Sequence, residues 1–326
     1  MTSVQIIGKS LVFLSLPIAG VLGQASPASK PPAGPPPIEV PFDRVKPEAT
    51  FDVADLTGLA ATEDALWIVR SAGQAIRIDA GKNIAGPPVA IGGTPCAGLA
   101  SAFGALWVPR CDPSGLVRVD PASAAVAATR GVAMGSGAGA VAAGTGSVWL
   151  LTSAGTVVRI DPDTNGVVAE LYVAGGATDL LFHDDAVWVA SSGSRKVTKI
   201  NAHTNVAETT VDIAGGPERL AAGEGAVWSL NADGGVSRID PRDVRAIAAI
   251  EIGAGAGGGW IAAGEGSVWV SAPGAPLVRI DPRVNRVVHR LTGGDGGPLA
   301  VGHRSLWLAT PGRVLRVDPK FIEALR

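Results

Sequence analysis

A pattern of about forty residues recurs seven times along this chain of 326 residues, and it leaves few folds open. Each copy contains four short segments separated by Gly-rich stretches. They are an aliphatic segment with alanine, a Trp between aliphatic residues, an apolar-Arg-apolar-Asp segment and a Val-rich segment. Successive Trp residues lie 38 to 42 residues apart: Trp67, Trp107, Trp149, Trp188, Trp228, Trp269 and Trp307. Repeats of this period are typical of four-stranded propeller blades. The sequence therefore predicts an all-β, seven-bladed β-propeller.

The position eight residues before each Trp marks the innermost strand of the predicted blade. It is aliphatic in every copy and usually followed by Ala, because seven strands that crowd round one axis need small side chains. The last copy provides three strands and no outer one. Residues 49–54, ATFDVA, alternate apolar and polar side chains, so we expect them to form the missing outer strand and close the ring over residues 49–319. Residues 320–326 are expected to be a C-terminal tail.

The amino-terminal stretch is typical of a secretory signal peptide. A single cation, Lys9, precedes an apolar run from Leu11 to Gly23 and then small residues, which places the signal peptide at residues 1–25. The run is shorter than the roughly 18 to 20 residues that span a bilayer, although an uncleaved anchor is the alternative. No later segment is apolar enough to span a membrane. The mature protein is therefore expected to be exported, to the periplasm or the extracellular space.

A Pro-rich stretch follows at residues 26–48. Its eight prolines cannot donate to a sheet ladder, so the stretch is interpreted as an extended, semi-rigid linker. A peptide ligand for a Pro-binding groove is the alternative. The formal net charge of −2 and the isoelectric point near 6.1 predict no nucleic-acid partner. We expect a monomer.

Two cysteines, Cys96 and Cys111, both lie in the second copy. If Leu99 pairs with Trp107 across the hairpin, the two cysteines lie almost opposite each other at its open end, where a disulfide can form. An exported protein would oxidise them. The sequence predicts a disulfide, with two free thiols as the alternative.

The third strand of each copy carries a cation two residues before an acid, with Lys199 and Asn201 as the variant in the fourth copy. A residue that occurs once per blade forms a ring, whereas a catalytic site is a single place. Asp before Pro starts a tight turn by accepting a backbone N–H, and the Arg can pair between neighbouring blades. We interpret these residues as a repeating structural polar staple.

No catalytic residue or metal ligand is identified. Residues 161–166, DPDTNG, resemble the opening of a calcium loop, but the twelfth position is Tyr172 where the loop requires Glu, so a hairpin turn is favoured. The four histidines lie in different copies, without other ligands at metal-binding spacing.

The repeats differ most at the position nine residues before each Trp, which is expected to lie at the mouth of the central channel. Four copies have Gly, Ala or Pro there, but three consecutive copies have Asp179, Arg219 and Trp260. Glu218 adjoins them, and Arg70 and Arg110 end Trp strands toward the same face. We predict a ligand site from these six residues. The alternative is an ion pair between Asp179 and Arg219, with Trp260 filling a gap.

The units GEGAVWSL…VSRIDPRD, GTGSVWLL…VVRIDPDTNGVVAELYVAGG and GEGSVWV…LVRIDPRVNRVV resemble the repeats of bacterial YVTN-type propellers and of the streptogramin lyase (virginiamycin B lyase) group. The resemblance covers residues 51–319 and implies an often exported seven-bladed propeller. The lyase uses a Glu-x-His pair and magnesium. This chain contains no Glu-x-His, so no catalytic residue is carried over.

We therefore expect a non-enzymatic binding or scaffold module, without a cofactor, that takes a small molecule or a protein loop at the channel mouth. The alternative is a diverged metal-dependent lyase or hydrolase, similar to the streptogramin lyase or to lactonase propellers. Only that alternative would involve Mg²⁺ or Ca²⁺.

Overall fold

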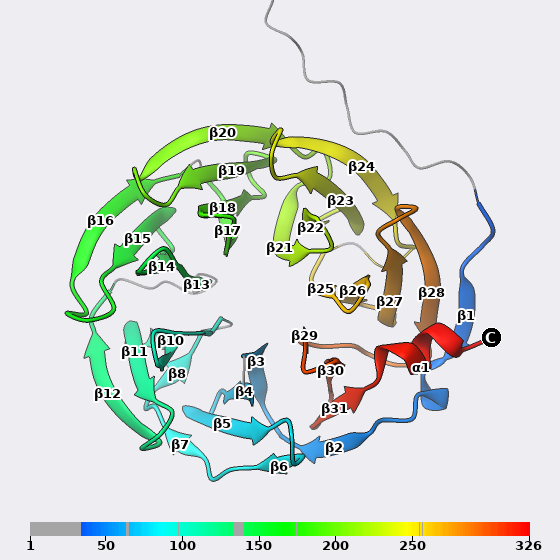
Figure 1. Cartoon of the computed structure of the whole chain (residues 1–326), viewed down its shortest axis with the longest axis horizontal. Helices are drawn as coiled ribbons and strands as arrows, with labels where there is room; N and C mark the ends of the chain where they lie inside the picture. The colour runs from blue at the N-terminus through cyan, green and yellow to red at the C-terminus, as the bar shows by residue number, and fades with distance from the viewer. Residues whose placement is uncertain are drawn as a thin grey trace, which may run out of the picture.

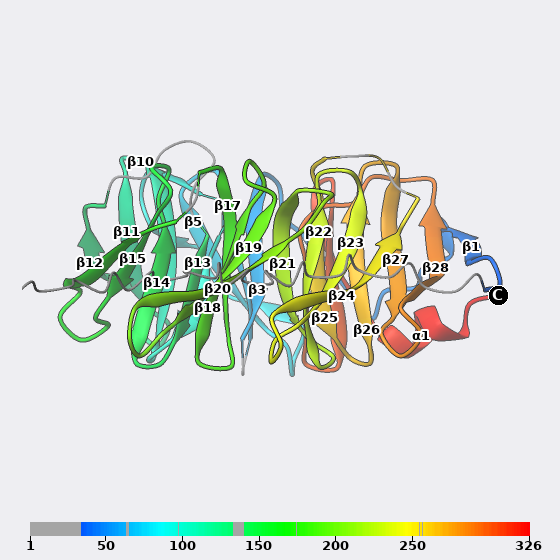
Figure 2. The ribbon, with the colours of Figure 1, turned by 90° about the horizontal axis from the view of Figure 1, so that it is seen from above.

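The computed structural model describes residues 34–62, 65–96, 98–132, 140–173, 175–253, 255 and 257–326. The described residues form seven sheets that stand side by side round a central axis (Figure 1). Viewed from the side, the ring is a flat disc (Figure 2). The predicted seven-bladed β-propeller is confirmed. The predicted signal peptide lies outside the described residues.

Each blade runs from the axis outward in four strand positions. The innermost strands are β3 (Leu56–Ala61), β8 (Thr94–Pro95) with β9 (Ala100–Ala102), β13 (Val141–Gly144), β17 (Ala177–His183), β21 (Pro217–Gly223), β25 (Trp260–Gly264) and β29 (Leu299–Gly302). The Trp strands are β4 (Ala65–Arg70), β10 (Ala105–Asp112), β14 (Ser147–Leu151), β18 (Ala186–Ser191), β22 (Ala226–Asn231), β26 (Ser267–Ala272) and β30 (Ser305–Thr310).

The two outer positions complete the blades. The third strands are β5 (Gln74–Asp79), β11 (Gly115–Asp120), β15 (Thr156–Ile160), β19 (Lys196–Asn201), β23 (Gly235–Asp240), β27 (Ala275–Asp281) and β31 (Arg313–Val317). The outer strands are β6 (Ile84–Ala85) with β7 (Val89–Ala90), β12 (Ala125–Arg130), β16 (Val167–Tyr172), β20 (Val206–Asp212), β24 (Arg245–Glu251), β28 (Arg286–Thr292) and β2 (Ala49–Asp52).

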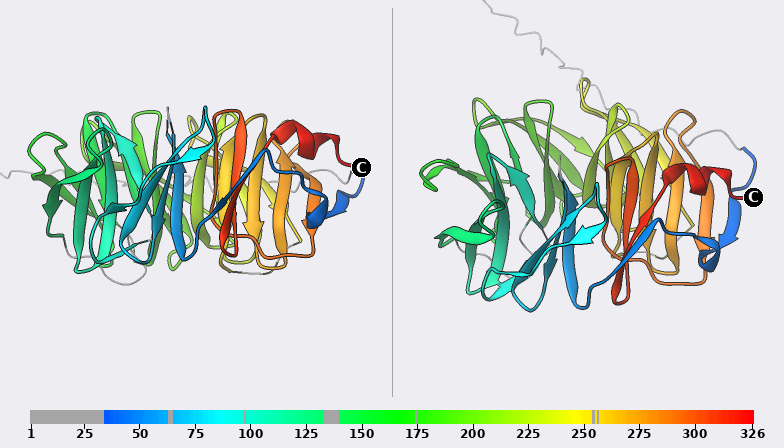
Figure 3. Two further views of the ribbon diagram at one scale, coloured as in Figure 1. Left: turned by 90° about the horizontal axis from the view of Figure 1, so that it is seen from below. Right: turned by 60° about the horizontal axis from the view of Figure 1, so that its bottom comes forward.

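The ring closes as the sequence predicts. Strand β2 pairs antiparallel with β31, so that Phe51 lies opposite Val314 and the start of the propeller completes the last blade (Figure 3). The Phe51 ring also packs against Trp307, with ring centroids 6.2 Å apart. Closure therefore joins the two ends of the repeat array by a sheet ladder and an aromatic contact.

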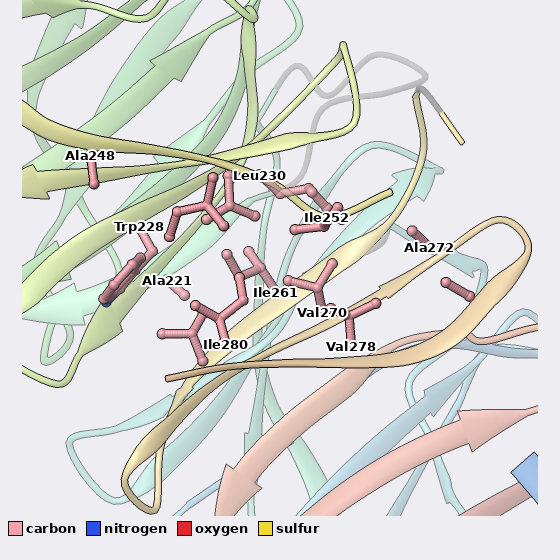
Figure 4. Packing of buried hydrophobic residues seen from close by; sticks show 14 of the residues in the cluster. Ala221, Trp228, Leu230, Ala248, Ile252, Ile261, Val270, Ala272, Val278 and Ile280 are labelled. Atoms are coloured by element: carbon pink, nitrogen blue, oxygen red, sulfur yellow. The ribbon is translucent and has the colours of Figure 1, made fainter. Parts of the chain in front are cut away.

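The hydrophobic core lies between blades. Side chains of a strand alternate between the two faces of its sheet, and each face packs against a neighbouring blade. Figure 4 shows one such interface, where Trp228 and Leu230 of the fifth blade meet Ile261, Val270 and Ile280 of the sixth. All seven repeat Trp side chains are buried. Each blade is thus stabilised by its two neighbours.

The inner hairpin of the second blade differs by one residue from the predicted pairing. Trp107 lies opposite Ala100, not Leu99, because Phe103 and Gly104 form a two-residue turn between Ala102 and Ala105. Further along the hairpin the register shifts, so that Arg110 lies opposite Pro95. Cys96 and Cys111 still meet across the hairpin, with Cα atoms 5.2 Å apart, and form the predicted disulfide.

Part of the predicted linker is a strand. Residues Ile38–Pro41 form β1, which pairs in parallel with β28 and adds a fifth strand to the sixth blade. Pro41 is tolerated because it ends an edge strand, where its missing N–H interrupts no ladder. Val40 is buried, and Glu39 forms an ion pair with Arg290 at 3.0 Å. A short 3₁₀ helix, Phe42–Arg44, follows. The linker interpretation is therefore wrong for this segment.

The predicted C-terminal tail is mostly a helix, α1 (Pro319–Ala324). The Asp318 side chain caps it by accepting the backbone N–H of Lys320, and the buried Ile322 and Leu325 join the same cluster as Val40. Across the described residues, none of the helices has the length and apolar character to cross a bilayer.

Third-strand cations join the blades by two contacts each. The cation stacks on the Trp of its own blade, at 5.0 to 6.0 Å from the ring centroid in the six blades from the second to the seventh. It also donates a hydrogen bond to the following blade or to α1. The acceptors are Pro162 O for Arg118, Asn205 Oδ1 for Arg159, Pro241 O for Lys199, Pro282 O for Arg238, Glu323 Oε1 for Arg279 and Ala80 O for Arg316.

The staple therefore differs from the expected one in its partners. The cations contact backbone carbonyl groups, asparagine side chains, Glu48 and Glu323 rather than the repeat acids. The acids stabilise the turns by accepting backbone N–H groups, as expected. Asp161 Oδ1 accepts the backbone N–H groups of Asp163 and Thr164 at 2.9 Å each. Asp161 is thereby used in a hairpin turn.

We expect Arg238→Ala to lower the free energy of unfolding by about 2–4 kcal/mol, because it removes both the Trp228 contact and the hydrogen bonds to Pro282 and Asn285. Thermal or urea denaturation measures the change. Arg245→Ala is the matched control in the same blade, since Arg245 is exposed and pairs only locally with Asp243, and it should cost less than about 1 kcal/mol. Equal losses in the two variants would refute the proposed role of the staple.

Candidate functional site

A cavity of about 350 Å³ opens on the propeller axis, near the point where the innermost strands begin. Most of its apolar lining comes from the aliphatic residues eight positions before each Trp: Leu59, Leu99, Val141, Leu180, Leu220 and Ile261. The repeated pattern that builds the inner strands therefore also gives the channel an apolar wall.

Three consecutive blades supply the polar part of the cavity. Asp179 projects from β17, Arg219 from β21 and Trp260 from β25, and Thr178 lies beside Asp179. The structure thus brings together the three residues at which the repeats differ most. Gly98 and Ala140 line the same cavity. They have little or no side chain, so they leave space on their own side of it.

The Asp179 carboxylate connects two blades through backbone groups. Its Oδ1 accepts the N–H of Leu180 at 3.0 Å, and its Oδ2 accepts the N–H of Leu220 in the next blade at 2.8 Å. No ion pair joins it to Arg219, both residues being in the part of the chain that is described. Both carboxylate oxygens are therefore occupied by the protein itself.

Arg219 stacks on Trp260 instead. Its guanidinium carbon lies 4.7 Å from the centroid of the indole ring, within the range of a cation–π contact. The alternative expectation, an ion pair between Asp179 and Arg219, is not what the side chains form. Arg219 still acts on Asp179 electrostatically across the cavity.

The other three predicted residues lie outside the lining of this cavity. Glu218 Oε2 accepts the backbone N–H of Gly258 at 3.2 Å. Arg70 donates to Ala54 O at 2.9 Å, and Arg110 donates to Pro113 O at 2.8 Å. Each of these side chains fastens a loop at the same face. For Arg70 and Arg110 the reason is geometric, since the Trp strands stand one position further from the axis than the innermost strands.

Burial raises the pKa of Asp179 to about 6, from 3.8, although Arg219 and the two backbone N–H groups oppose the shift. Part of the carboxylate faces the cavity, but protein surrounds it on all other sides, so it loses most of its hydration. The negative charge therefore costs folding free energy above about pH 6. The cost decreases as the pH falls from about 6 to 3.8 and is absent well below 3.8, where the carboxyl group is neutral in both folded and unfolded chains.

This region has further parts that the sequence does not predict. The disulfide lines the same cavity through both of its cysteines, which their spacing alone did not indicate. A second cavity of about 450 Å³ lies on the other side of Arg219 and Trp260, and Ser271 and Asp295 contribute to it. Over the described residues, no group of three or more His, Cys, Asp or Glu side chains is placed to hold a metal ion.

We expect Asp179→Asn to gain stability relative to the natural chain as the pH rises from about 4 to about 7, because the variant carries no buried charge. The pKa shift from 3.8 to about 6 sets the change in this difference at roughly 2–3 kcal/mol. Urea unfolding at several pH values measures it. Thr178→Val is the control, since it alters a neighbouring hydrogen-bonding side chain without a titrating group. A difference that stays constant with pH for Asp179→Asn would contradict the assignment.

Comparison with known proteins identifies the fold but no family. No family model matches the sequence, and no curated protein matches it. Among solved structures, BamB from Moraxella catarrhalis is similar at a TM-score of 0.61 and 15% identity, with 81% of this chain and 83% of that chain covered.

Two further structures are similar over nearly their whole lengths. U3-55K has a TM-score of 0.68 at 11% identity and covers 85% of this chain and 99% of its own. The WD40 repeats of RRP9 have a TM-score of 0.70 at 12% identity, and the match covers 85% of this chain and 98% of that chain. The TM-scores show a shared β-propeller fold. The identities are too low to confirm the resemblance to YVTN-type propellers and the streptogramin lyase group.

Proposed function

We propose that this protein is a non-enzymatic binding module that receives a small molecule, or a loop of another protein, at the mouth of its central channel. The observation that carries the proposal is the axial cavity, in which an aliphatic wall meets Asp179, Arg219 and Trp260. A β-propeller fold is consistent with a binding or scaffold role, and it is the site that must support the choice.

Differences between the repeats support this proposal. Glycine, alanine or proline occupies the same position in the other four blades, so the fold does not need a charged or aromatic side chain there. The cavity volume of about 350 Å³ lies within the range of small-molecule sites, which are mostly apolar with a few polar groups. The charge of Asp179 lowers the folding stability, and charged groups of this kind cluster at functional sites, which supports a role of Asp179 in binding.

The residues of the cavity favour binding over catalysis. Among the described residues of the lining, Asp179 is the one acidic side chain and no histidine accompanies it. Two backbone N–H groups already donate to its oxygens. General acid–base catalysis usually needs a second titratable group within reach of the substrate. A diverged lyase or hydrolase would have to obtain that group from elsewhere.

We also propose that the protein is exported, to the periplasm or the extracellular space, and acts as a monomer. The disulfide between Cys96 and Cys111 supports export, because such bonds persist in oxidising compartments. The amino-terminal sequence supports it independently, through its apolar run and small residues.

A neutral apolar dye, N-phenyl-1-naphthylamine, tests whether the cavity binds ligands. We expect saturable binding at one site, seen as increased dye fluorescence, because the aliphatic wall can accept an apolar group. Ala140→Phe should weaken this binding by about tenfold or more, since the new ring fills the cavity.

Ala127→Phe on the exposed outer strand β12 is the matched control and should leave dye binding unchanged. Melting temperatures of both variants check that each still folds. The proposal fails if the folded Ala140→Phe variant binds the dye as well as the natural chain does.

A further inference from the structure

Arg219 differs from the other cations that stack on Trp rings. The six others, all on third strands, each donate a hydrogen bond to another part of the protein. Arg219 stacks on Trp260 in the same way, but within the described chain its guanidinium donates to no protein acceptor. The indole therefore holds a planar cation whose N–H groups remain available.

Trp260 also keeps a free donor. Six of the repeat Trp residues donate their indole N–H to the carbonyl five residues earlier: Trp107, Trp149, Trp188, Trp228, Trp269 and Trp307. Trp260 is only partly buried, and no acceptor for its N–H exists among the described residues. Two neighbouring donors at the channel mouth thus lack a partner among the residues that the structure describes.

These donors stand between two cavities. Arg219 and Trp260 line the axial cavity on one side and the cavity of about 450 Å³ on the other. The second cavity includes Ser271, whose side chain is 1% exposed and whose hydroxyl has no hydrogen-bond partner. A buried polar group without a partner is costly, which favours a ligand or water beside it.

The unused groups define the chemistry of the missing partner. The one carboxylate of the axial cavity is already satisfied, while the guanidinium, the indole N–H and the Ser271 hydroxyl can all donate. A guanidinium held flat matches the two oxygens of a carboxylate, and it binds them with two parallel hydrogen bonds. The aliphatic wall next to it suits an alkyl chain.

We propose that the channel mouth binds aliphatic monocarboxylates, with the carboxylate on Arg219 and the Trp260 N–H and the alkyl chain along the aliphatic wall of the axial cavity. This inference rests on the proposed binding function and names its ligand class. The same chemistry is offered by a free acid and by the C-terminus of a peptide that ends in an aliphatic residue.

Asp179 makes this binding dependent on pH. Its pKa of about 6 means that its charge, which repels a carboxylate, is lost as the pH falls toward 6 and below. The charged groups near it come from β21, namely Arg219 and Glu218, while β13, β14 and β18 carry no charged residue. Affinity should therefore rise from about pH 8 to about pH 5.5 and fall again once the ligand itself is protonated.

Isothermal titration calorimetry with hexanoate, hexylamine and hexan-1-ol tests the ligand class on the same protein at about pH 6. We expect hexanoate to bind at least about tenfold more tightly than the other two, because only it can form charge-assisted hydrogen bonds with Arg219. Arg219→Gln should remove this preference while the neutral dye still binds.

Arg110→Gln is the matched control, because Arg110 lies at the same face but donates to Pro113 O and lines neither cavity. It should keep the preference for hexanoate. Asp179→Asn should make hexanoate affinity independent of pH between about 6 and 8. N-acetyl-valyl-leucine and its amide identify the source: tighter binding of the free peptide acid than of hexanoate assigns the ligand to a polypeptide C-terminus, and the reverse order assigns it to a free acid.

The two proposals can fail separately. If the dye binds the cavity but hexanoate binds no better than hexylamine or hexan-1-ol, or Arg219→Gln keeps the preference, the monocarboxylate assignment is wrong and the binding module stands. If folded Ala140→Phe leaves the binding of dye and hexanoate unchanged, both are wrong.

Discussion

The contact between a third-strand cation and the next blade is the interaction on which the ring depends. The seven sheets share no backbone ladder with one another, so the contacts between blades all involve side chains, which pack together or bond to backbone groups of the next blade. Hydrophobic packing between sheets supplies most of the burial, but it does not fix their relative position. A cation stacked on its own Trp and bonded to a carbonyl in the next blade, as Arg238 is to Trp228 and Pro282, sets that position. The contact recurs round the ring, and at the sixth blade the C-terminal helix supplies the acceptor, Glu323.

Closure of the ring then makes the two chain ends part of the structure. Strand β2 completes the last blade, and β1 and α1 pack together beside the sixth blade around Val40 and Ile322. Both additions cover surface that an open array of blades would expose. The outer edge of the sixth blade is consequently paired with β1.

Because the blades are joined through their Trp strands and third strands, the residues at the axis are free to vary. The innermost strands need small or aliphatic side chains for packing, but a position near the start of each strand faces the channel mouth and contributes little to that packing. Asp179, Arg219 and Trp260 occupy such positions in three adjacent blades. Their placement has a cost, because the Asp179 charge is poorly hydrated. It also has a consequence, because a guanidinium and an indole N–H that have no acceptor in the described part of the chain stand next to an aliphatic wall. Together they form an asymmetric site on a scaffold with near sevenfold symmetry.

The sequence by itself determined the number of blades, their strand order, the closing strand and the disulfide, because each follows from a period or from spacing within one hairpin. It also located Asp179, Arg219 and Trp260 at one mouth, since equivalent positions of a repeat lie on one ring. Only the tertiary structure decided that Arg219 stacks on Trp260 rather than pairing with Asp179, and that Arg70, Arg110 and Glu218 fasten loops. Repeat spacing fixes where a backbone lies, whereas the direction of a long side chain depends on neighbours from another blade. β1 depends on the tertiary structure for the same reason: its proline-rich sequence predicts a linker, and it forms a strand because it pairs with the edge strand β28 of another part of the chain.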